Sequence, residues 1–238
     1  MARQPRTFLP GNPVHLLQRG NNRQVCFFKG VDYTVYLDKL REASRDYAVA
    51  IHSFVLMTNH VHLLCTPTNE NGISHMMQGL GRYFVRYINE AYGRTGTLWE
   101  GRFKASMVNS EPYLLTVSRY IELNPVRAGM VTHPAEYPWS SYRGNALDYA
   151  IQMLTPHPVY LALGQSDAER QLHYRALFDA QIPELTLEQI RTAANKSWVL
   201  GDGRFKQQIE KQLGHSLPPF PRGGDRKSTR FKQREKGA

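Results

Sequence analysis

The chain has 238 residues, of which 41% are hydrophobic, and a formal net charge of +10 at pH 7. This composition is typical of a globular protein with a full core. No stretch reaches the roughly 18 consecutive apolar residues of a membrane helix, so we expect no membrane partner. The two cysteines, Cys26 and Cys65, are too few for a disulfide framework and lack the spacing of a zinc site, which indicates a reducing cytoplasm.

The positive charge is concentrated near the C-terminus. Residues 201–238 contain ten Lys or Arg and four Asp or Glu, which accounts for +6 of the net +10. A surplus of this size attracts polyanions, so nucleic acid is the first partner to consider. A solvated tail that only improves solubility is the alternative.

The hydrophobic pattern of the first half predicts strands and helices in a regular order. We expect strands at residues 14–19, 48–57, 60–66 and 103–108, and helices at 33–43 (capped by Asp32), 73–92 and 111–128. The first six elements follow the split βαβ, ferredoxin-like plan of an α+β fold, in which an antiparallel sheet packs its helices on one face. The other face is then expected to be free for a site or a partner.

After residue 129 the pattern changes to an irregular connection and short helices. Residues 132–142 are rich in proline and aromatics, and a helix is expected at 167–178. A second helix begins at Thr186, where Gln189 can complete a capping box, and a third short helix ends at Gly214. These three helices form either a small helix-turn-helix-like bundle or an ordinary appendage. We expect a first domain at 8–143 that holds the functional site, a helical extension at 144–216 that assists nucleic-acid binding, and a disordered basic tail at 217–238.

Two histidines alternate on the strand that begins at residue 60. Side chains at positions i and i+2 of a strand point to the same face, about 7 Å apart, so His60 and His62 project together. Two converging imidazoles can bind a divalent metal. A pair of half-exposed strand histidines without a ligand is the alternative.

A second motif lies on the helix predicted at 111–128. Tyr120 and Asn124 are i, i+4 neighbours beside the apolar stripe of that helix, and from there they can reach a neighbouring site. A boundary tyrosine that packs its ring and hydrates its hydroxyl is the alternative. Together with His60 and His62, the amide oxygen of Asn124 would make a three-ligand metal site with open positions for phosphate oxygen and water. A tyrosine phenol has a pKa near 10 and needs such help to act as a nucleophile.

These motifs resemble those of the HUH endonucleases and, more closely, of the single-tyrosine branch called REP-associated tyrosine transposases. The resemblance rests on five blocks in the expected order, namely QRGNNR at 18–23, MTNHVHLL at 57–64, LWEGRF at 98–103, YIELNPVRAG at 120–129 and YPWSSY at 137–142. Relatives outside this branch usually carry glutamine at the position of Asn124, which keeps the amide oxygen on a longer side chain.

The resemblance implies a specific chemistry. Tyr120 would attack a DNA phosphate and become joined to the 5′ side, while His60, His62 and Asn124 would hold Mg²⁺ or Mn²⁺. Because the covalent link stores the energy of the broken phosphodiester, rejoining would need no ATP, and the chain carries no nucleotide-binding motif. The branch also implies a bacterial, nucleoid-associated protein that acts as a monomer rather than a dimer.

Members of this branch recognise a DNA hairpin beside a short single strand. Unstacked bases need aromatic or arginine platforms, and the backbone needs cations. We therefore expect DNA contacts from six residues in the motif loops or beside the tyrosine helix, namely Arg19, Asn21, Arg23, Trp99, Arg102 and Arg127. A core position for Trp99 and a helix C-terminal role for Arg127 are the alternatives.

Three other functions use parts of the same pattern. A domesticated relative would bind palindromes without cutting them, and a metal-dependent hydrolase would use the histidines but give Tyr120 no covalent role. An RNA-binding module would use the ferredoxin-like sheet, although the predicted strands carry no RNP-type aromatic pattern.

Overall fold

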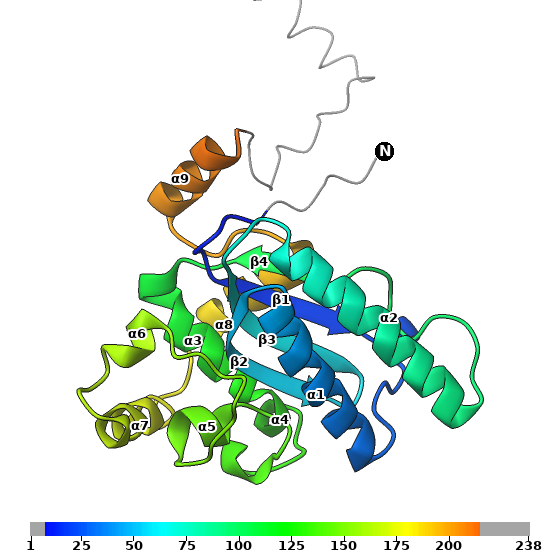
Figure 1. The fold of residues 1–238 in the computed structure, drawn as a ribbon. Helices are drawn as coiled ribbons and strands as arrows, with labels where there is room; N and C mark the ends of the chain where they lie inside the picture. The colour runs from blue at the N-terminus through cyan, green and yellow to red at the C-terminus, as the bar shows by residue number, and fades with distance from the viewer. Residues whose placement is uncertain (1–7, 215–238) are drawn as a thin grey trace, which may run out of the picture.

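A computed structural model describes residues 8–214, and the predicted basic tail lies outside the described residues. Four strands and nine α-helices are present in this part of the chain (Figure 1). In chain order the elements are β1 (Val14–Arg19), η1 (Asn21–Arg23), α1 (Gly30–Asp46), β2 (Val49–Met57), β3 (His60–Pro67), α2 (Gly72–Tyr92), β4 (Lys104–Met107), α3 (Ser110–Glu122), α4 (Asn124–Arg127), η2 (Pro134–Glu136), α5 (Tyr142–Ala146), α6 (Pro158–Leu161), α7 (Asp167–Ala176), α8 (Glu184–Lys196) and α9 (Gly203–Leu213).

The four strands form one antiparallel sheet in the order β2-β3-β1-β4. This order, with α1 and α2 as the crossover helices, is the ferredoxin-like plan predicted from the sequence. β3 lies between β2 and β1, and His60 pairs with Met57 on one side and with Arg19 on the other. The His60 end of β3 therefore lies beside the end of β1.

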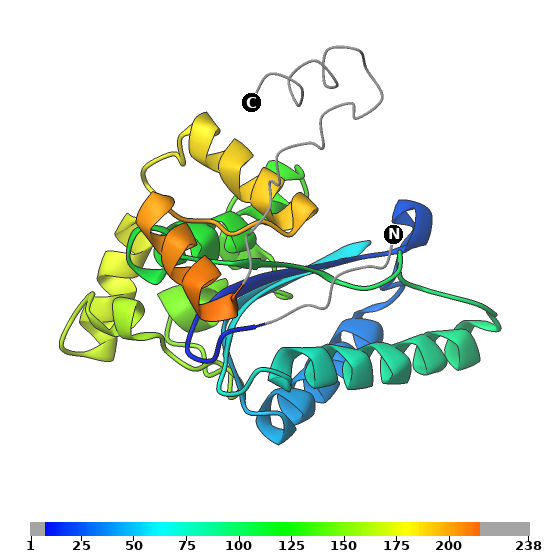
Figure 2. The ribbon, with the colours of Figure 1, turned by 90° about the horizontal axis from the view of Figure 1, so that it is seen from above.

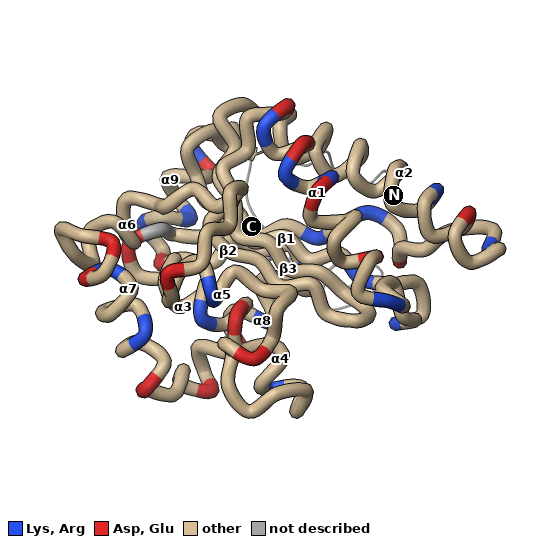
Figure 3. Tube along the Cα trace, turned by 60° about the horizontal axis from the view of Figure 1, so that its bottom comes forward, with Lys and Arg blue, Asp and Glu red and all other residues tan. Residues whose placement is uncertain are grey.

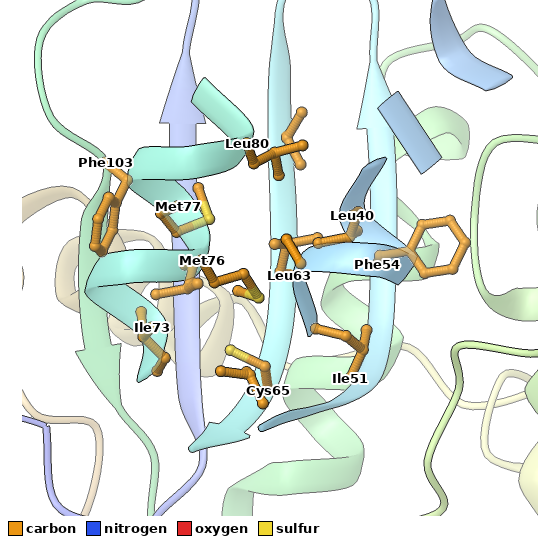
Figure 4. Close-up of a cluster of buried hydrophobic side chains, with 14 of the residues drawn as sticks. Leu40, Ile51, Phe54, Leu63, Cys65, Ile73, Met76, Met77, Leu80 and Phe103 are labelled. Atoms are coloured by element: carbon orange, nitrogen blue, oxygen red, sulfur yellow. The ribbon is translucent and has the colours of Figure 1, made fainter. Parts of the chain in front are cut away.

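One face of the sheet packs against α1 and α2. The strand residues that point to this face alternate with those that point away, and they meet the apolar stripes of both helices. Leu63 on β3 lies between Leu40 of α1 and Met76 of α2 in this cluster (Figure 4). This layer is the larger hydrophobic core of the described residues.

The opposite face is covered as well, so the prediction of a free face was wrong. Val55, Met57 and Leu64 point to this side and pack against residues of α3 and α8. Figure 2 shows the sheet edge-on with α1 and α2 on one side and α8 on the other. The physical reason is that these strand positions are apolar and need burial, which the helices that follow β4 provide.

Both edges of the sheet are paired with irregular segments. The backbone N–H of Leu56 on β2 donates to the carbonyl of Trp139, and Ser141 N–H donates to Phe54. At the β4 edge, Leu200 N–H donates to the carbonyl of Met107. These bonds satisfy edge groups that would otherwise invite pairing with another chain.

The helix predicted at 111–128 is interrupted at Leu123. Residues 110–122 form α3 and residues 124–127 form the single turn α4. Pro125 has no N–H to donate to the carbonyl four residues earlier, and it disfavours the helical conformation of Asn124 before it. Gly129, with φ of +68°, follows α4 and permits the chain to turn away.

The C-terminal helices pack separately rather than as one bundle. α7 places Tyr174 against Tyr142 of α5, α8 lies on β1 and β4, and α9 adds Ile209 to the hydrophobic cluster that also contains residues of α1 and α2. α8 begins at Glu184 after Pro183, so the capping box predicted for Thr186 does not form. Among the helices of residues 8–214, none combines the length and apolar character that would span a bilayer.

Candidate active site

His60 and His62 project from β3 on the face covered by α3. Their ring centroids are 5.1 Å apart, with the rings nearly perpendicular. His62 is buried and His60 is half-buried, because His60 lies at the start of the strand. The i, i+2 spacing has thus brought the two imidazoles to one place, as predicted.

The Nδ1 atom of each histidine is engaged by a neighbour. Nδ1 of His60 lies 2.7 Å from Oδ1 of Asn59, and Nδ1 of His62 lies 2.8 Å from Nε2 of His15 on β1. Because an amide oxygen only accepts, His60 donates from Nδ1, which leaves the lone pair on its Nε2. If His62 likewise donates to His15, its Nε2 also has a free lone pair.

All three histidines are neutral at neutral pH. Burial lowers the pKa of His15 to about 3. It also lowers the pKa of His60 to about 4, together with the charge of Arg19, and a hydrogen bond with Asn124 partly offsets this shift. Burial, with the nearby His15, His60 and arginine charges, holds the pKa of His62 well below its usual value. Neutral imidazole is the form that binds a metal.

Tyr120 of α3 packs against two of these rings. Its side chain is only 7% exposed, and its ring meets those of His15 and His62 edge-on at centroid distances of 5.9 and 5.8 Å. The Arg127 guanidinium lies 4.3 Å from the centre of the Tyr120 ring and donates to its backbone carbonyl at 2.6 Å. α4 therefore holds the Arg127 guanidinium against the Tyr120 ring.

Asn124 completes the group from the first position of α4. It is half-buried, and its side chain hydrogen-bonds His60. Within residues 8–214 no group of three or more His, Cys, Asp or Glu side chains could hold a metal. A divalent metal at this place would therefore take two imidazole nitrogens and the amide oxygen of Asn124. This donor set fits a hard or borderline divalent ion that keeps water or phosphate at its remaining positions.

The residues predicted as DNA contacts divide into three groups. Arg19 and Arg127 lie close enough to the histidines for their charges to lower the pKa of His62. Asn21 and Arg23 form η1 just beyond β1, and Arg102 is exposed in the loop before β4.

Trp99 is a core residue, so its predicted role as a platform for bases is corrected. It is 5% exposed and stacks on Phe84 of α2, with 6.0 Å between the ring centroids. Tyr36 of α1 meets it edge-on at 6.4 Å. Because its faces are occupied by these rings, Trp99 offers none to an unstacked base.

Two buried polar residues were missed by the sequence reasoning, His15 at the site and Glu122 elsewhere on α3. His15 touches both His62 and Tyr120, and strand alternation alone could have placed it on the same face of β1 as Arg19. Glu122, two residues after Tyr120, is fully buried and accepts hydrogen bonds from Ser141, Asn145 and Tyr174. Burial raises the pKa of Glu122 to about 7. No signal in the sequence marked it as buried.

The chain is similar to known transposases. The family described as "Transposase IS200 like" matches residues 11–124, which include both histidines, Tyr120 and Asn124. Among solved structures, a REP-associated tyrosine transposase bound to a REP hairpin is 19% identical, with a TM-score of 0.53, 67% of this chain covered and 93% of that chain. A candidate transposase from Deinococcus radiodurans is 20% identical, with a TM-score of 0.36, 51% of this chain covered and 96% of that chain. No curated protein matches.

Proposed function

Because residues 11–124 match the family of IS200-like transposases, we propose that this protein cuts and rejoins single-stranded DNA through Tyr120. The observation that carries the proposal is the packing of the Tyr120 ring against the His15–His62 pair. A tyrosine held edge-on to two neutral imidazoles, with an arginine over its ring, is in polar surroundings rather than in a purely apolar core, and a phosphate bound there would lie beside it.

The histidines and Asn124 would hold the metal. His60 and His62 would ligate Mg²⁺ or Mn²⁺ through Nε2, since Nδ1 of each is engaged, and Asn124 would ligate through its amide oxygen. When bound, such an ion polarises a phosphate and orients it for in-line attack. Arg19 and Arg127 add positive charge where the negative charge of the phosphate would lie.

The covalent step exchanges one phosphate ester for another. The Tyr120 oxygen attacks the phosphorus, the bond to the 3′ oxygen breaks, and a 5′-phosphotyrosine and a free 3′-hydroxyl result. The phenol loses one proton and the departing 3′ oxygen gains one, so the step is balanced. Rejoining is the reverse reaction with a 3′-hydroxyl as the nucleophile, and it needs no nucleotide cofactor because the ester bond is conserved.

His15 would orient His62 for this chemistry. Metal binding through Nε2 of His62 requires its Nδ1 to carry the proton and His15 Nε2 to accept it. His15 can do so because its low pKa keeps it neutral, with the proton on its other nitrogen. His15 is therefore a positioning residue in the proposal.

The substrate we propose is a hairpin with an adjoining single strand. The support is that the REP-associated transposase with the same fold is bound to a REP hairpin. The single strand would pass Arg19 and the exposed residues of η1, which lie at the His60 end of β3.

The test is a denaturant-resistant adduct between the protein and a labelled hairpin oligonucleotide taken from the intergenic palindromes of the host genome. We expect an adduct with wild-type protein in Mg²⁺ or Mn²⁺, and none with EDTA or with Tyr120→Phe, because the nucleophile is then absent. Cleavage that persists in Tyr120→Phe would instead indicate a hydrolase with a water nucleophile. Tight binding without cleavage of the correct palindrome would indicate the domesticated DNA-binding protein.

A further inference from the structure

A groove of about 790 Å³ runs along α2 and the loop that connects it to β4. We call it the α2 groove. Its charged lining residues are Arg82, Arg86 and Glu90 of α2 and Arg94 and Arg102 of the loop. It lies on the side of the sheet covered by α1 and α2, away from Tyr120, and it is not part of the site described above.

The α2 groove is strongly basic. Four arginines and one glutamate give its lining a net charge of +3. Glu90 pairs with Arg86 at 3.7 Å, but both side chains are more than 70% exposed, so water screens this pair and a phosphate can compete for the arginine. Figure 3 marks the basic and acidic positions along α2.

The loop beside the groove is tied to the active site through the backbone. Gly20, which follows β1, pairs with Trp99, and the Glu100 N–H donates to the carbonyl of Arg19 at 2.8 Å. Arg19 pairs in turn with His60 across the sheet. A DNA chain that leaves the site past Arg19 therefore reaches the loop that carries Arg102.

The groove offers cations but no open aromatic face. Of the described residues that line it, Trp99 is the single aromatic, and its ring is stacked on Phe84 in the core. Surfaces that hold unpaired strands combine cations with aromatic platforms for the bases, whereas paired DNA presents mainly its phosphates. The chemistry of the groove thus favours the backbone of a duplex.

We propose that the α2 groove holds the phosphate backbone of the paired stem of the hairpin whose single strand is cut at Tyr120. The inference rests on the proposed function and adds a second contact surface to it. The protein would then read its substrate in two places, with the stem on the arginines of α2 and the single strand beside the histidines. The stem contact is electrostatic and does not depend on base sequence.

The test compares Arg82→Gln/Arg86→Gln with a control that removes two exposed arginines of α1, Arg41→Gln/Arg45→Gln. Affinity is measured by fluorescence anisotropy over a range of salt concentrations in EDTA. The ligands are a DNA hairpin with its single-stranded extension, the extension alone, and an RNA hairpin of the same sequence. For the DNA hairpin we expect weaker binding by the groove variant. The slope of log affinity against log salt concentration should be smaller by about two, because each missing arginine leaves one phosphate contact unmade and its counterions unreleased. The extension alone should bind the groove variant and wild type equally, and the control should keep the wild-type slope.

Three results would overturn the proposal: an unchanged hairpin slope, an equally weakened binding of the extension alone, or a weakening confined to the RNA hairpin. Adduct formation is followed in the same wild-type preparation, so the two proposals can fail separately. An adduct with an unchanged slope in the groove variant removes the groove and leaves the proposed function standing. A reduced slope without any wild-type adduct removes the covalent chemistry and keeps the stem contact.

Discussion

The two faces of the sheet differ in what they bury, although they share the same four strands. The face under α1 and α2 carries Val14, Leu16, Val61 and Leu63 and is almost entirely apolar. The face under α3 carries residues from the same strands, one position out of phase, and among them are the polar His15, His62, Ser53 and Ser106, all buried. Because successive side chains of a strand point to opposite faces, residues that stabilise the apolar core alternate with residues of the candidate site along the same strands.

The polar face is stabilised by hydrogen bonds in addition to apolar burial, whereas the other face is stabilised by apolar burial alone. His62 bonds to His15, Ser53 donates to Ser118 of α3 at 3.3 Å, and Ser106 donates to the carbonyl of Trp198 at 2.5 Å. A buried polar group costs free energy unless it is paired, so this face tolerates few substitutions of one partner alone. The comparison teaches that a site can lie inside a second core, provided that its polar groups satisfy one another.

The largest expected effect is on the chemistry of the polar face. His60→Ala should reduce adduct formation at least about 100-fold, because even the loss of a residue that only orients a metal ligand costs 10- to 100-fold. The change should leave the free energy of unfolding within about 2 kcal/mol, since His60 is half-buried and loses only its side-chain bonds to Asn59 and Asn124. Quenched adduct assays measure the rate of adduct formation, and urea unfolding measures the free energy of unfolding.

The matched control on the other face is Leu63→Ala, three residues along the same strand. Leu63 is fully buried between α1 and α2, so its truncation should cost about 2–5 kcal/mol of unfolding free energy. Adduct formation per folded molecule should stay at the wild-type level. If Leu63→Ala lost the chemistry while His60→Ala kept it, the separation of the two faces would be wrong.

The next effect concerns the pH dependence of the unfolding free energy that Glu122 of α3 produces. Glu122 has a folded pKa of about 7 against an ordinary value of 4.5, so its stabilising contribution is present below pH 4.5 and is lost as the pH rises through 7. In Glu122→Gln this loss is absent. Between pH 4.5 and 8 the variant should gain on the order of 3 kcal/mol of unfolding free energy relative to wild type.

Urea unfolding of both proteins at several pH values measures this difference. The buried histidines, whose pKa values are lowered, make both proteins more stable as the pH rises towards 6.5, but this trend is shared and cancels in the difference. Parallel stability curves for the two proteins would mean that Glu122 is ionised in the folded state throughout, with its three hydrogen bonds outweighing its burial.

The local part of this architecture could be predicted from the sequence. Periods of two and 3.6 residues located the four strands, α1 and α2, and the i, i+2 rule brought His60 and His62 together. The break at Leu123 was also encoded, because Pro125 cannot continue the hydrogen-bond ladder, but the apolar stripe on both sides of it concealed the signal.

The non-local part could not be predicted. Strand alternation places His15 on the same face of β1 as Arg19, but its contact with His62 depends on the register of β1 and β3, in which Leu17 is the direct partner of His62, so this contact was missed. Part of the cover over the polar face comes from α8, more than 100 residues after β3, and its position follows from packing rather than from local propensity. Trp99 lies in a loop with no periodicity, and its burial depends on the rings of α1 and α2 that reach it.

The smallest effect would sharpen the role of the polar pair itself. Since His15 is proposed to accept the proton of His62 Nδ1, His15→Phe should weaken Mn²⁺ binding to the DNA-free protein by about 10- to 100-fold, because His62 loses the acceptor that orients it. His15→Gln can place an amide oxygen near the position of Nε2 and should retain most of the affinity. Electron paramagnetic resonance counts free Mn²⁺ during titration, and ¹⁵N chemical shifts of His62 report whether the proton is on Nδ1.

The Phe and Gln variants separate positioning from packing. If His15 served only to fill space next to Tyr120, Phe would be the better replacement, because its ring fits the edge-on contact at 5.9 Å and Gln does not. Retention of Mn²⁺ affinity in Phe and its loss in Gln would therefore overturn the positioning role. The positioning role predicts that His15→Gln keeps its Mn²⁺ affinity and His15→Phe loses it. It also predicts that the His62 proton is on Nδ1 in wild type and in His15→Gln, but is shared between both nitrogens in His15→Phe. This result would mean that the residue opposite His62 acts through its hydrogen bond. On the α1–α2 face no residue would show this preference, since Leu63 and its neighbours act through volume alone.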